Sequence, residues 1–255
     1  MKKKLLTDVE LRARWSQGRQ DKYYVDADTV LTPAAADFIR EHGITLCIRA
    51  QKTSETMTRT QIPMRDGKPV YQDAATGQEM LCKGEGMTHL RGNLLVAKTH
   101  PQIAFRGKLD TLMAMIMQVQ IVAQEQGQKQ MVSDLEELLE FCHKILAAEV
   151  KDEPLCQVMM LGMSSEEIRY NSQQVKKVYG IDHPIPSYKM GKLCVALNRL
   201  RTHIRETELS AAQAFGCGEA CSRPDIIEAL NRMSSCVYIL MCRKLSGFYE
   251  RGSRL

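Results

Sequence analysis

The chain has 255 residues and a formal net charge of +5; 44% of its residues are hydrophobic, 25% charged and 5% aromatic. This length fits one domain with or without a small appendage, and the near-average composition excludes bulk disorder. The longest apolar run, residues 236–242, is too short to cross a bilayer, and Thr7 and Asp8 interrupt what would otherwise be a signal peptide. Nine cysteines without an export signal indicate a reducing compartment, so we expect a cytoplasmic protein with free thiols that handles an anion.

Residues 1–50 are expected to form a small N-terminal α/β unit. Thr32 can cap a helix that starts at Pro33 and ends at Gly43, because a hydroxyl N-cap, an early proline and a terminal glycine are typical of helix boundaries. Residues 44–48 follow as a short β-like run. Residues 3–12 have the spacing of a short amphipathic helix, which we interpret as structural.

Residues 51–100 are expected to form an irregular segment. Glycines and prolines punctuate it as far as residue 92, and few apolar residues recur at any period. A structureless loop of this length in a compact domain is usually functional or disordered. It contains Gly84 and Gly86, a glycine pair that alone is only a weak indication of a phosphate-binding loop.

Residues 101–255 are predicted to be helical. Apolar residues recur at helical spacing over about 101–127, 133–149, 164–178, 187–215 and 224–249. Ser133 and Ser164 are each followed three residues later by a glutamate, which is the capping-box pattern of a helix start. The connections are short and no strand alternation competes. We therefore expect an all-α core folded as a five-helix bundle, with the small N-terminal α/β unit as an appendage.

The fourth predicted helix carries a stripe that changes from apolar to charged. Its members are Met190, Cys194, Leu197 and Arg201, then Ile204 or Arg205, and finally Glu208. Arg201 and Arg205 are one turn apart, so both guanidinium groups can converge on a polyphosphate or on a pair of carboxylates. The alternative is a solvated helix face on which Glu206 and Glu208 are the local partners.

Two more polar residues lie on apolar stripes. Asn231 lies on the stripe of the fifth helix, where it can hold a ligand or make a structural amide contact. Asp110 lies on the first helix between Gly107 and Ala114, whose small side chains would let a second helix or a ligand approach closely. A carboxylate in such a place needs a partner, and Arg201 is a candidate.

The cysteines do not show the spacing of a metal site. Cys217 and Cys221 form a C-x-x-x-C pair, whereas Cys82 and His89 lie elsewhere in the sequence. A zinc or iron site would require these side chains to converge. We therefore predict no metal site, and we interpret the abundant methionines as core packing.

A longer motif precedes the first predicted helix. Residues 87–101 contain Met-Thr-His-Leu followed by a valine-x-lysine, and they lead into residues 105–112, which carry Asp110. This stretch resembles the ethanolamine-utilisation branch of the ATP:cob(I)alamin adenosyltransferases and is similar to a diverged form of their propanediol-utilisation type. The resemblance covers about residues 83–250, and residues 31–44 are similar to the ethanolamine branch specifically.

The resemblance implies a five-helix bundle with a nucleotide site at defined positions. The family's fourth-helix motif, two arginines separated by three residues, matches Arg201 and Arg205. In the family the first arginine pairs with the first-helix aspartate across a subunit boundary and helps to hold ATP, which implies the pair Arg201 and Asp110. The second arginine and the fifth-helix asparagine contact the nucleotide, which implies these roles for Arg205 and Asn231.

Further positions follow from the same resemblance. The family's lysine after the loop and its loop threonine correspond to Lys98 and Thr88. Glu208, one turn beyond Arg205, is a further candidate for the same site. The family also displaces the lower axial ligand of cobalt with an apolar side chain, for which the candidates by position are Ile185, Tyr188 and Phe248. Some members of the branch carry a histidine and a cysteine cluster before the Met-Thr-His-Leu segment. This chain has Cys82 alone there, which supports the prediction of no metal site.

The implied reaction is adenosyl transfer from ATP to cobalamin. Reduced Co(I) attacks C5′ of ATP, the polyphosphate leaves, and adenosylcobalamin forms for ethanolamine or diol catabolism. Co(I) is already a strong nucleophile, so the protein's part is to position the reactants and to stabilise the charge on the leaving group. Mg²⁺, bound mainly through phosphate oxygens, is expected with such a ligand.

The resemblance also implies partners and a location. A nucleotide site at a bundle interface implies a homo-oligomer, either a homotrimer or a dimer. A reductase, an adenosylcobalamin-dependent lyase or dehydratase and a microcompartment shell are the other expected partners, without nucleic acid or membrane. The chain would then lie in the cytoplasm or inside a bacterial microcompartment. The alternative function is a non-catalytic helical chaperone for nucleotide or corrinoid, or a microcompartment scaffold that uses residues 3–12 to dock.

Overall fold

The computed structural model describes residues 4–8, 11–12, 22–26, 29–42, 45–49, 62–155 and 158–251. The chain divides into two compact units, residues 1–61 and residues 62–255. No helix in these described ranges is long and apolar enough to span a membrane.

The N-terminal unit combines short parallel strand pairs with one helix. The pairs are β1 (Lys4–Leu6) with β3 (Thr29–Leu31), and β2 (Lys22–Asp26) with β4 (Thr45–Arg49). The helix α2 (Pro33–Glu41) is capped as predicted, because the Thr32 side chain accepts a hydrogen bond from the Ala35 amide at 3.3 Å. Leu6, Leu11, Ala35 and Phe38 form the buried cluster of the unit.

The predicted helix over residues 3–12 is wrong at its start. Lys4–Leu6 is a strand, whose main chain bonds to β3 instead of forming helical bonds. Of the other described residues in this range, Asp8, Leu11 and Arg12 are helical. Residues 3, 9 and 10, and the predicted helix end at Gly43, lie outside the described residues.

Short strands occupy much of residues 62–97, where the sequence predicted an irregular segment. One hairpin joins β5 (Met64–Arg65) to β6 (Lys68–Pro69). A sheet of order β8-β7-β10-β9 contains β7 (Tyr71–Asp73), β8 (Glu79–Met80), β9 (Met87–Arg91) and β10 (Leu94–Ala97). Strands of two to five residues are too short to show a period of two in the sequence. Several of the glycines mark turns, as at Gly67 and Gly77, where a φ of +73° is free of strain only for glycine.

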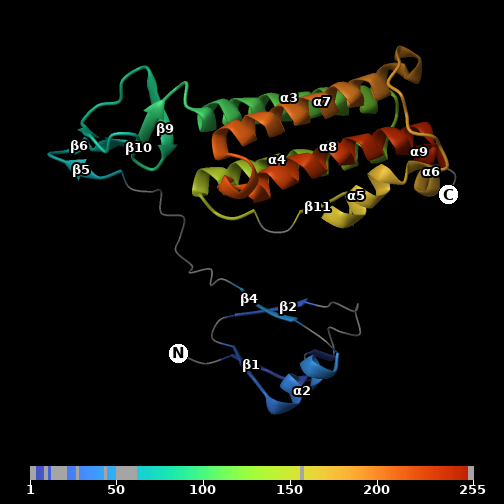
Figure 1. Ribbon diagram of the computed structural model, residues 1–255, viewed down its shortest axis with the longest axis horizontal. Coiled ribbons are helices and arrows are strands. Elements are labelled where there is room, and N and C mark those ends of the chain that lie inside the picture. Colours follow the sequence, from blue (N-terminus) through green and yellow to red (C-terminus); the bar gives the residue numbers. More distant parts are fainter. Residues whose placement is uncertain are drawn as a thin grey trace. The chain divides into compact units, whose positions relative to one another are not determined.

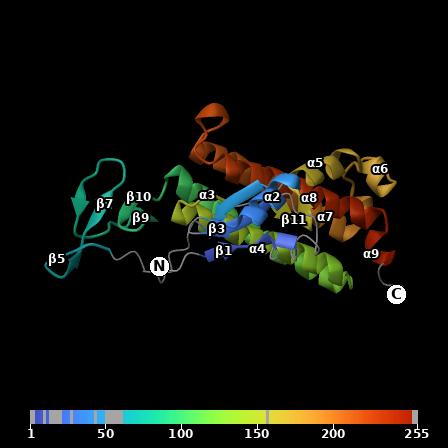
Figure 2. The same ribbon diagram turned by 90° about the horizontal axis from the view of Figure 1, so that it is seen from below.

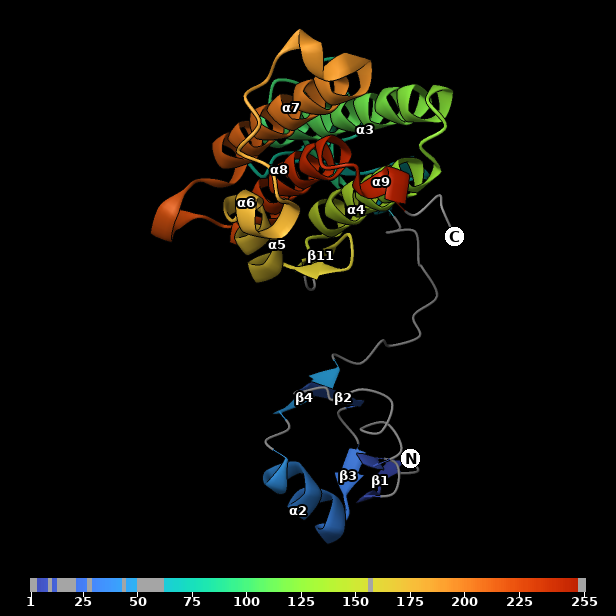
Figure 3. The same ribbon diagram turned by 90° about the vertical axis from the view of Figure 1, so that its right-hand side faces the viewer.

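Four long helices form the core of the second unit. They are α3 (Pro101–Glu125), α4 (Lys129–Lys151), α7 (Gly191–Phe215) and α8 (Pro224–Leu245). Figures 1 and 3 show α3 and α7 side by side in one layer and α4 and α8 in the other. The shorter α5 (Ser165–Gln173) packs against α8. This arrangement confirms the predicted all-α core with small α/β elements.

Several helix boundaries differ from the prediction. Ser164 caps α5 through the predicted capping box, but α4 begins at Lys129 and not near Ser133. Its extra turn follows from Gly127, whose φ of +68° reverses the chain after α3, and from the burial of Met131. The predicted third and fifth helices are both interrupted. Their final parts are α6 (Val175–Tyr179) and α9 (Phe248–Arg251), and the predicted fourth helix starts with a separate 3₁₀ turn, η1 (Tyr188–Met190).

One end of the bundle brings together the start of α3, the end of α7 and the start of α8. The rings of Phe105 and Phe215 meet edge to face there, with centroids 5.4 Å apart. A loop of eight residues, 216–223, then leads from α7 into α8. The sheet of β7 to β10 lies beyond the start of α3 at this same end (Figures 1 and 2). The start of α3, the end of α7 and the start of α8 therefore lie at the same end of the unit as the sheet.

Candidate functional site

A cleft of about 770 Å³ between α7 and α8 is lined by three of the predicted site residues, Arg205, Glu208 and Asn231. Asn231 Nδ2 donates a hydrogen bond to Glu208 Oε1 at 3.0 Å, which fixes two side chains from different helices against each other. The sequence placed Asn231 on the buried stripe of its helix. It is exposed to the cleft instead, because the neighbouring Leu230 and Met233 fill the core positions.

Arg205 is exposed and makes no hydrogen bond or ion pair with any residue that the structure describes. The two glutamates that a solvated helix face would offer it are engaged elsewhere. Glu206 pairs with Lys108 at 3.5 Å, and Glu208 accepts the bond from Asn231. A guanidinium without a protein partner at the edge of a cleft can give all of its donors to an anionic ligand.

Arg232 is a cleft residue to which the sequence gave no role. Its Nη1 donates to Asn231 Oδ1 at 2.8 Å, and its Nε donates to Ser165 Oγ at 2.9 Å. Ser165 in turn donates to Glu228 Oε1 at 2.6 Å. The oxygen and the nitrogen of the Asn231 amide are thus both held, which sets its orientation. The available signal was its place directly after Asn231, the residue matched to the family's fifth-helix asparagine.

Arg201 does not line this cleft, and it is half-buried. Its Nε and Nη2 both donate to Oδ1 of Asn198, one turn earlier on α7, at 3.2 and 3.1 Å. Its charge also acts on Tyr238 of α8: burial and Cys242 raise the pKa of Tyr238 to about 12, and the charge of Arg201 opposes that rise. The within-chain partner of Arg201 is therefore an amide, and its pairing with Asp110 across a subunit boundary stays a prediction.

Asp110 lies on an exposed stripe of α3. Its carboxylate has no polar partner within the described part of this chain. Further along the same stripe, Met117 is 48% exposed and Ile121 is 56% exposed, so the face that the sequence marked as apolar is not the core face. The buried face of α3 runs instead through Leu109 and Leu112. An exposed apolar stripe beside an unpaired carboxylate is typical of a contact surface.

Thr88 and Lys98 lie at the same end of the strand pair β9–β10, Thr88 near the start of β9 and Lys98 directly after β10. Thr88 of β9 pairs with Val96 of β10, and the Lys98 amide donates to the Gly86 carbonyl at 2.9 Å. The turn at Gly86 is therefore hydrogen-bonded to the main chain of Lys98. Lys98 is exposed, Thr88 is half-buried, and neither lines the cleft between α7 and α8 within one chain.

The three apolar candidates fall into different places. Tyr188 is 82% exposed and lines two pockets of about 400 and 210 Å³ on the α3 and α7 side, while Ile185, 83% exposed, lies on the loop before it. Asn198, the partner of Arg201, lines the smaller of these pockets. Phe248 belongs to a separate cavity of about 1300 Å³ that also contains the buried Asp134.

The described cysteines are free thiols, as expected. Cys217 and Cys221 line the α7–α8 cleft. Burial raises the pKa of Cys142 to about 12, so that thiol stays protonated at neutral pH. Across the described ranges, no three histidine, cysteine, aspartate or glutamate side chains are grouped as a metal site would require.

Comparison with known proteins supports the motif-based interpretation. Residues 81–244 match the cobalamin adenosyltransferase family. The corrinoid adenosyltransferase EutT of Salmonella typhimurium strain LT2 is 30% identical over 250 residues, which cover 92% of this chain and 90% of the relative. EutT of Escherichia coli K12 is 31% identical over 250 residues, covering 94% and 91%. The chain therefore belongs to the cobalamin adenosyltransferase family, and within it to the EutT type.

Proposed function

We propose that the chain transfers the 5′-deoxyadenosyl group of ATP to Co(I) of cobalamin and so makes adenosylcobalamin, for the breakdown of ethanolamine or a diol. The observation that carries the site is the unpaired Arg205 beside the oriented Asn231 amide, within the residues that match the family. As the Co–C5′ bond forms, the bond from C5′ to the triphosphate oxygen breaks and negative charge collects on the leaving group. An arginine whose donors are free suits that charge.

The α7–α8 cleft would hold the nucleotide through several groups. Arg205 would bind the phosphates, and the fixed amide of Asn231 would contact the nucleotide in one orientation. Glu208 and Glu228 also line the cleft, and their carboxylate oxygens are the donor type that Mg²⁺ prefers. A Mg²⁺ ion would bind mainly through the phosphates and neutralise part of their charge.

A second copy of the chain would complete the site. Asp110 and the exposed apolar residues Met117 and Ile121 give α3 a surface suited to contact with a second subunit. In a homotrimer Asp110 would pair with Arg201 of a neighbouring copy and fix that guanidinium, and Thr88 and Lys98 would add a donor and a positive charge on the phosphates. Asp110→Asn should then shift the assembly toward monomer, or weaken ATP binding, in sedimentation and titration measurements. Wild-type behaviour in both would refute the pair.

The corrinoid would lie on the α3 and α7 side. Tyr188 is the best-placed apolar side chain to displace the lower ligand of cobalt, because it is exposed and lines a pocket that reaches Asn198, the partner of Arg201; Ile185 is exposed on the loop just before it. Phe248 lies in a different cavity and is a weaker candidate. The reaction requires a reductase to supply Co(I) and implies an adenosylcobalamin-dependent lyase or dehydratase as consumer, in the cytoplasm or within a microcompartment.

The test is the spectral change from reduced cobalamin to adenosylcobalamin upon addition of ATP. We expect ATP-dependent formation of the product by the full chain under anaerobic reduction. No turnover with Co(I) confirmed by its own absorbance would refute the enzyme function. In that case the chain would be a non-catalytic protein that binds a nucleotide or a corrinoid.

A further inference from the structure

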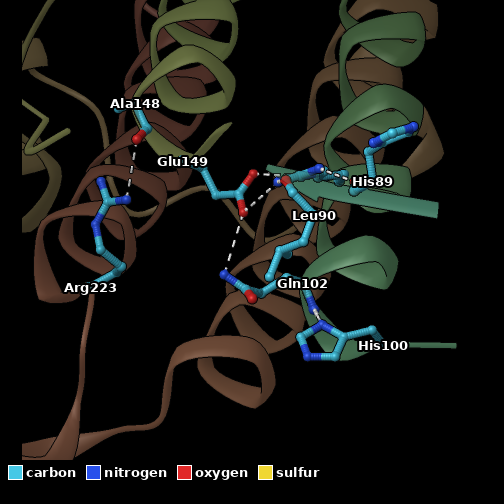
Figure 4. A network of polar contacts seen from close by, with 8 residues as sticks. His89, Leu90, His100, Gln102, Ala148, Glu149 and Arg223 are labelled. Atoms are coloured by element: carbon cyan, nitrogen blue, oxygen red, sulfur yellow. Dashed lines mark hydrogen bonds and ion pairs between the residues drawn. The ribbon is translucent and has the colours of Figure 1, made fainter. Parts of the chain in front are cut away.

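The last turn of α4 and the residues just after it, 148–155, are the attachment point for two other parts of the unit. One is strand β9, which carries Thr88, and the other is the start of α8, the helix that carries Asn231. Figure 4 shows the groups that meet there, with Glu149 of α4 extending toward Gln102 and toward the strand of His89 and Leu90, and with Arg223 reaching Ala148. Both candidate parts of the ATP site are therefore fastened to the same turns of one helix.

Glu149 is the centre of the first attachment. Its side chain is 1% exposed, and its carboxylate accepts hydrogen bonds from Arg106 Nε at 2.6 Å and from Arg106 Nη2 at 3.1 Å. Gln102 Nε2 lies 3.5 Å from the same carboxylate. Arg106 and Gln102 both belong to α3, so this ion pair, in which Glu149 is buried and Arg106 is 18% exposed, joins α3 to α4 at the end of the bundle that carries the sheet.

Arg106 extends from Glu149 to the main chain of β9. Its Nη1 donates to the His89 carbonyl at 3.2 Å and its Nη2 to the Leu90 carbonyl at 2.6 Å. Because the guanidinium is planar and its donors have fixed directions, these bonds set the position of the strand itself rather than of one side chain. Thr88 directly precedes His89, and Lys98 directly follows the strand paired with β9.

Two further contacts hold the same region. Arg91 of β9 forms an ion pair with Asp152, just after α4. Arg223, the residue before α8, donates to the Ala148 and Glu153 carbonyls at 3.4 and 3.0 Å. The start of α8 is thus also set against the end of α4, two turns before Asn231.

Stability alone is a poor explanation of the buried pair. Well-packed apolar side chains of similar volume are often at least as stable as a buried ion pair, because desolvation offsets the attraction. An apolar pair cannot, however, bind two strand carbonyls in fixed directions. The charged pair therefore fixes the position of strand β9, which carries Thr88 and pairs with the strand that leads into Lys98.

We propose that Glu149 and Arg106 are positioning residues for ATP, which hold Thr88 and Lys98 where the triphosphate meets them. This rests on the proposed function, and it adds two residues that touch no substrate themselves. Replacing either residue leaves strand β9 joined to Asp152 through Arg91, but the orientation of the strand is no longer fixed. ATP would then meet a less ordered Thr88 and Lys98, while the corrinoid pocket beside Tyr188 would be unchanged.

Steady-state kinetics of the full chain test this proposal through Arg106→Lys and Glu149→Gln. We expect KM for ATP to rise about tenfold in each, the scale of losing one or two bonds to a charged group. KM for the corrinoid should stay within about twofold of wild type, as should kcat at saturating ATP. Glu136→Gln is the matched control, because it also removes an α4 carboxylate that accepts a bond from α3, from Gln120 at 2.6 Å. It should leave KM for ATP unchanged.

Amide hydrogen exchange without any ligand separates positioning from general stability. In Arg106→Lys we expect faster exchange in residues 87–97 and wild-type exchange in α3, α4, α7 and α8. A merely structural role would speed exchange in the helices as well and leave KM for ATP unchanged in the folded fraction. The double variant R106E/E149R restores an ion pair but places a carboxylate near the carbonyls of β9, so KM should not recover.

The outcomes are distinguishable. If the wild-type chain makes no adenosylcobalamin, the function on which this proposal rests is refuted. If wild type turns over but Arg106→Lys keeps both its KM for ATP and its exchange in residues 87–97, the positioning role alone is overturned. Full recovery of KM in R106E/E149R would overturn it as well. Should Glu149→Gln fail to fold, Arg106→Lys still decides, because it retains the positive charge opposite Glu149.

Discussion

Removing the Arg205 side chain should separate activity from stability more sharply than any other change in the cleft. Arg205 is exposed on α7 and has no polar partner in the described part of the chain, so Arg205→Ala breaks no protein contact of this kind. A surface substitution of that sort changes the free energy of unfolding by no more than about 0.5 kcal/mol. Helical circular dichroism and the denaturation midpoint should therefore match wild type.

The same change should be costly for catalysis. A hydrogen bond to a charged group contributes about 1.5–3 kcal/mol, and each 1.36 kcal/mol corresponds to a tenfold rate effect, so kcat/KM for ATP should fall by about 10- to 100-fold. The kcat/KM of Arg205→Lys for ATP should lie between the values of wild type and of Arg205→Ala, because an ammonium keeps the positive charge but not the planar donor arrangement of a guanidinium. The assay is adenosylcobalamin formation at varied ATP concentration with Co(I) in excess.

A matched control is available on α5. Arg169 is also an exposed helical arginine and lies outside the α7–α8 cleft, and its guanidinium has no polar partner among the described residues. Arg169→Ala removes the same net charge, so any loss shared by both variants would reflect the overall field of the protein. Unchanged kinetics in Arg205→Ala, or a loss equal to that of Arg169→Ala, would remove Arg205 from the site.

Three further predictions concern other described residues. Iodoacetamide should label the exposed Cys217 in the cleft, and ATP should slow that labelling; equal rates with and without ATP would place the nucleotide elsewhere. Tyr249→Phe removes the hydroxyl that donates to buried Asp134 at 2.7 Å and should lower the unfolding free energy by about 1–3 kcal/mol, seen as a lower urea midpoint at constant m-value. An unshifted midpoint would contradict this. Burial alone would raise the pKa of Asp225, but bonds from Arg223 and the main chain outweigh it and lower that pKa below its ordinary value. Its stabilising contribution should therefore be complete above about pH 4 and be lost as the pH falls through the folded-state pKa. Asp225→Asn should reduce this loss of stability at low pH, measured as the free energy of unfolding at a series of pH values. The same loss as in wild type would refute the stabilising role of Asp225.

Helical periodicity predicted most of the second unit, and its errors have local physical causes. A period of 3.6 residues persists over 22 to 25 residues in α3, α4, α7 and α8, which makes it visible against noise. The start of α4 was misplaced because the capping pattern at Ser133 occurs inside a helix, where a serine and a glutamate need not cap anything. The strands between residues 64 and 97 were missed because their pairing is set by tertiary contacts and by turns, not by an alternation that two to five residues can display.

The position of a polar residue on an apolar helical stripe predicted part of the candidate site, and the same reasoning extends further than the sequence analysis took it. Arg205 and Glu208 were found because their stripe changes character along α7. On α4 the stripe through Cys142 and Ile145 leads one turn later to Glu149, which is equally a charge where periodicity requires an apolar side chain. Its partner could not be found from the sequence, because Arg106 lies 43 residues away and only the folded contact joins them. Where such a stripe reaches a charge, that face of the helix meets something other than the apolar core: the α7–α8 cleft at Arg205 and, at Glu149, the side chain of Arg106, which binds the strand that carries Thr88.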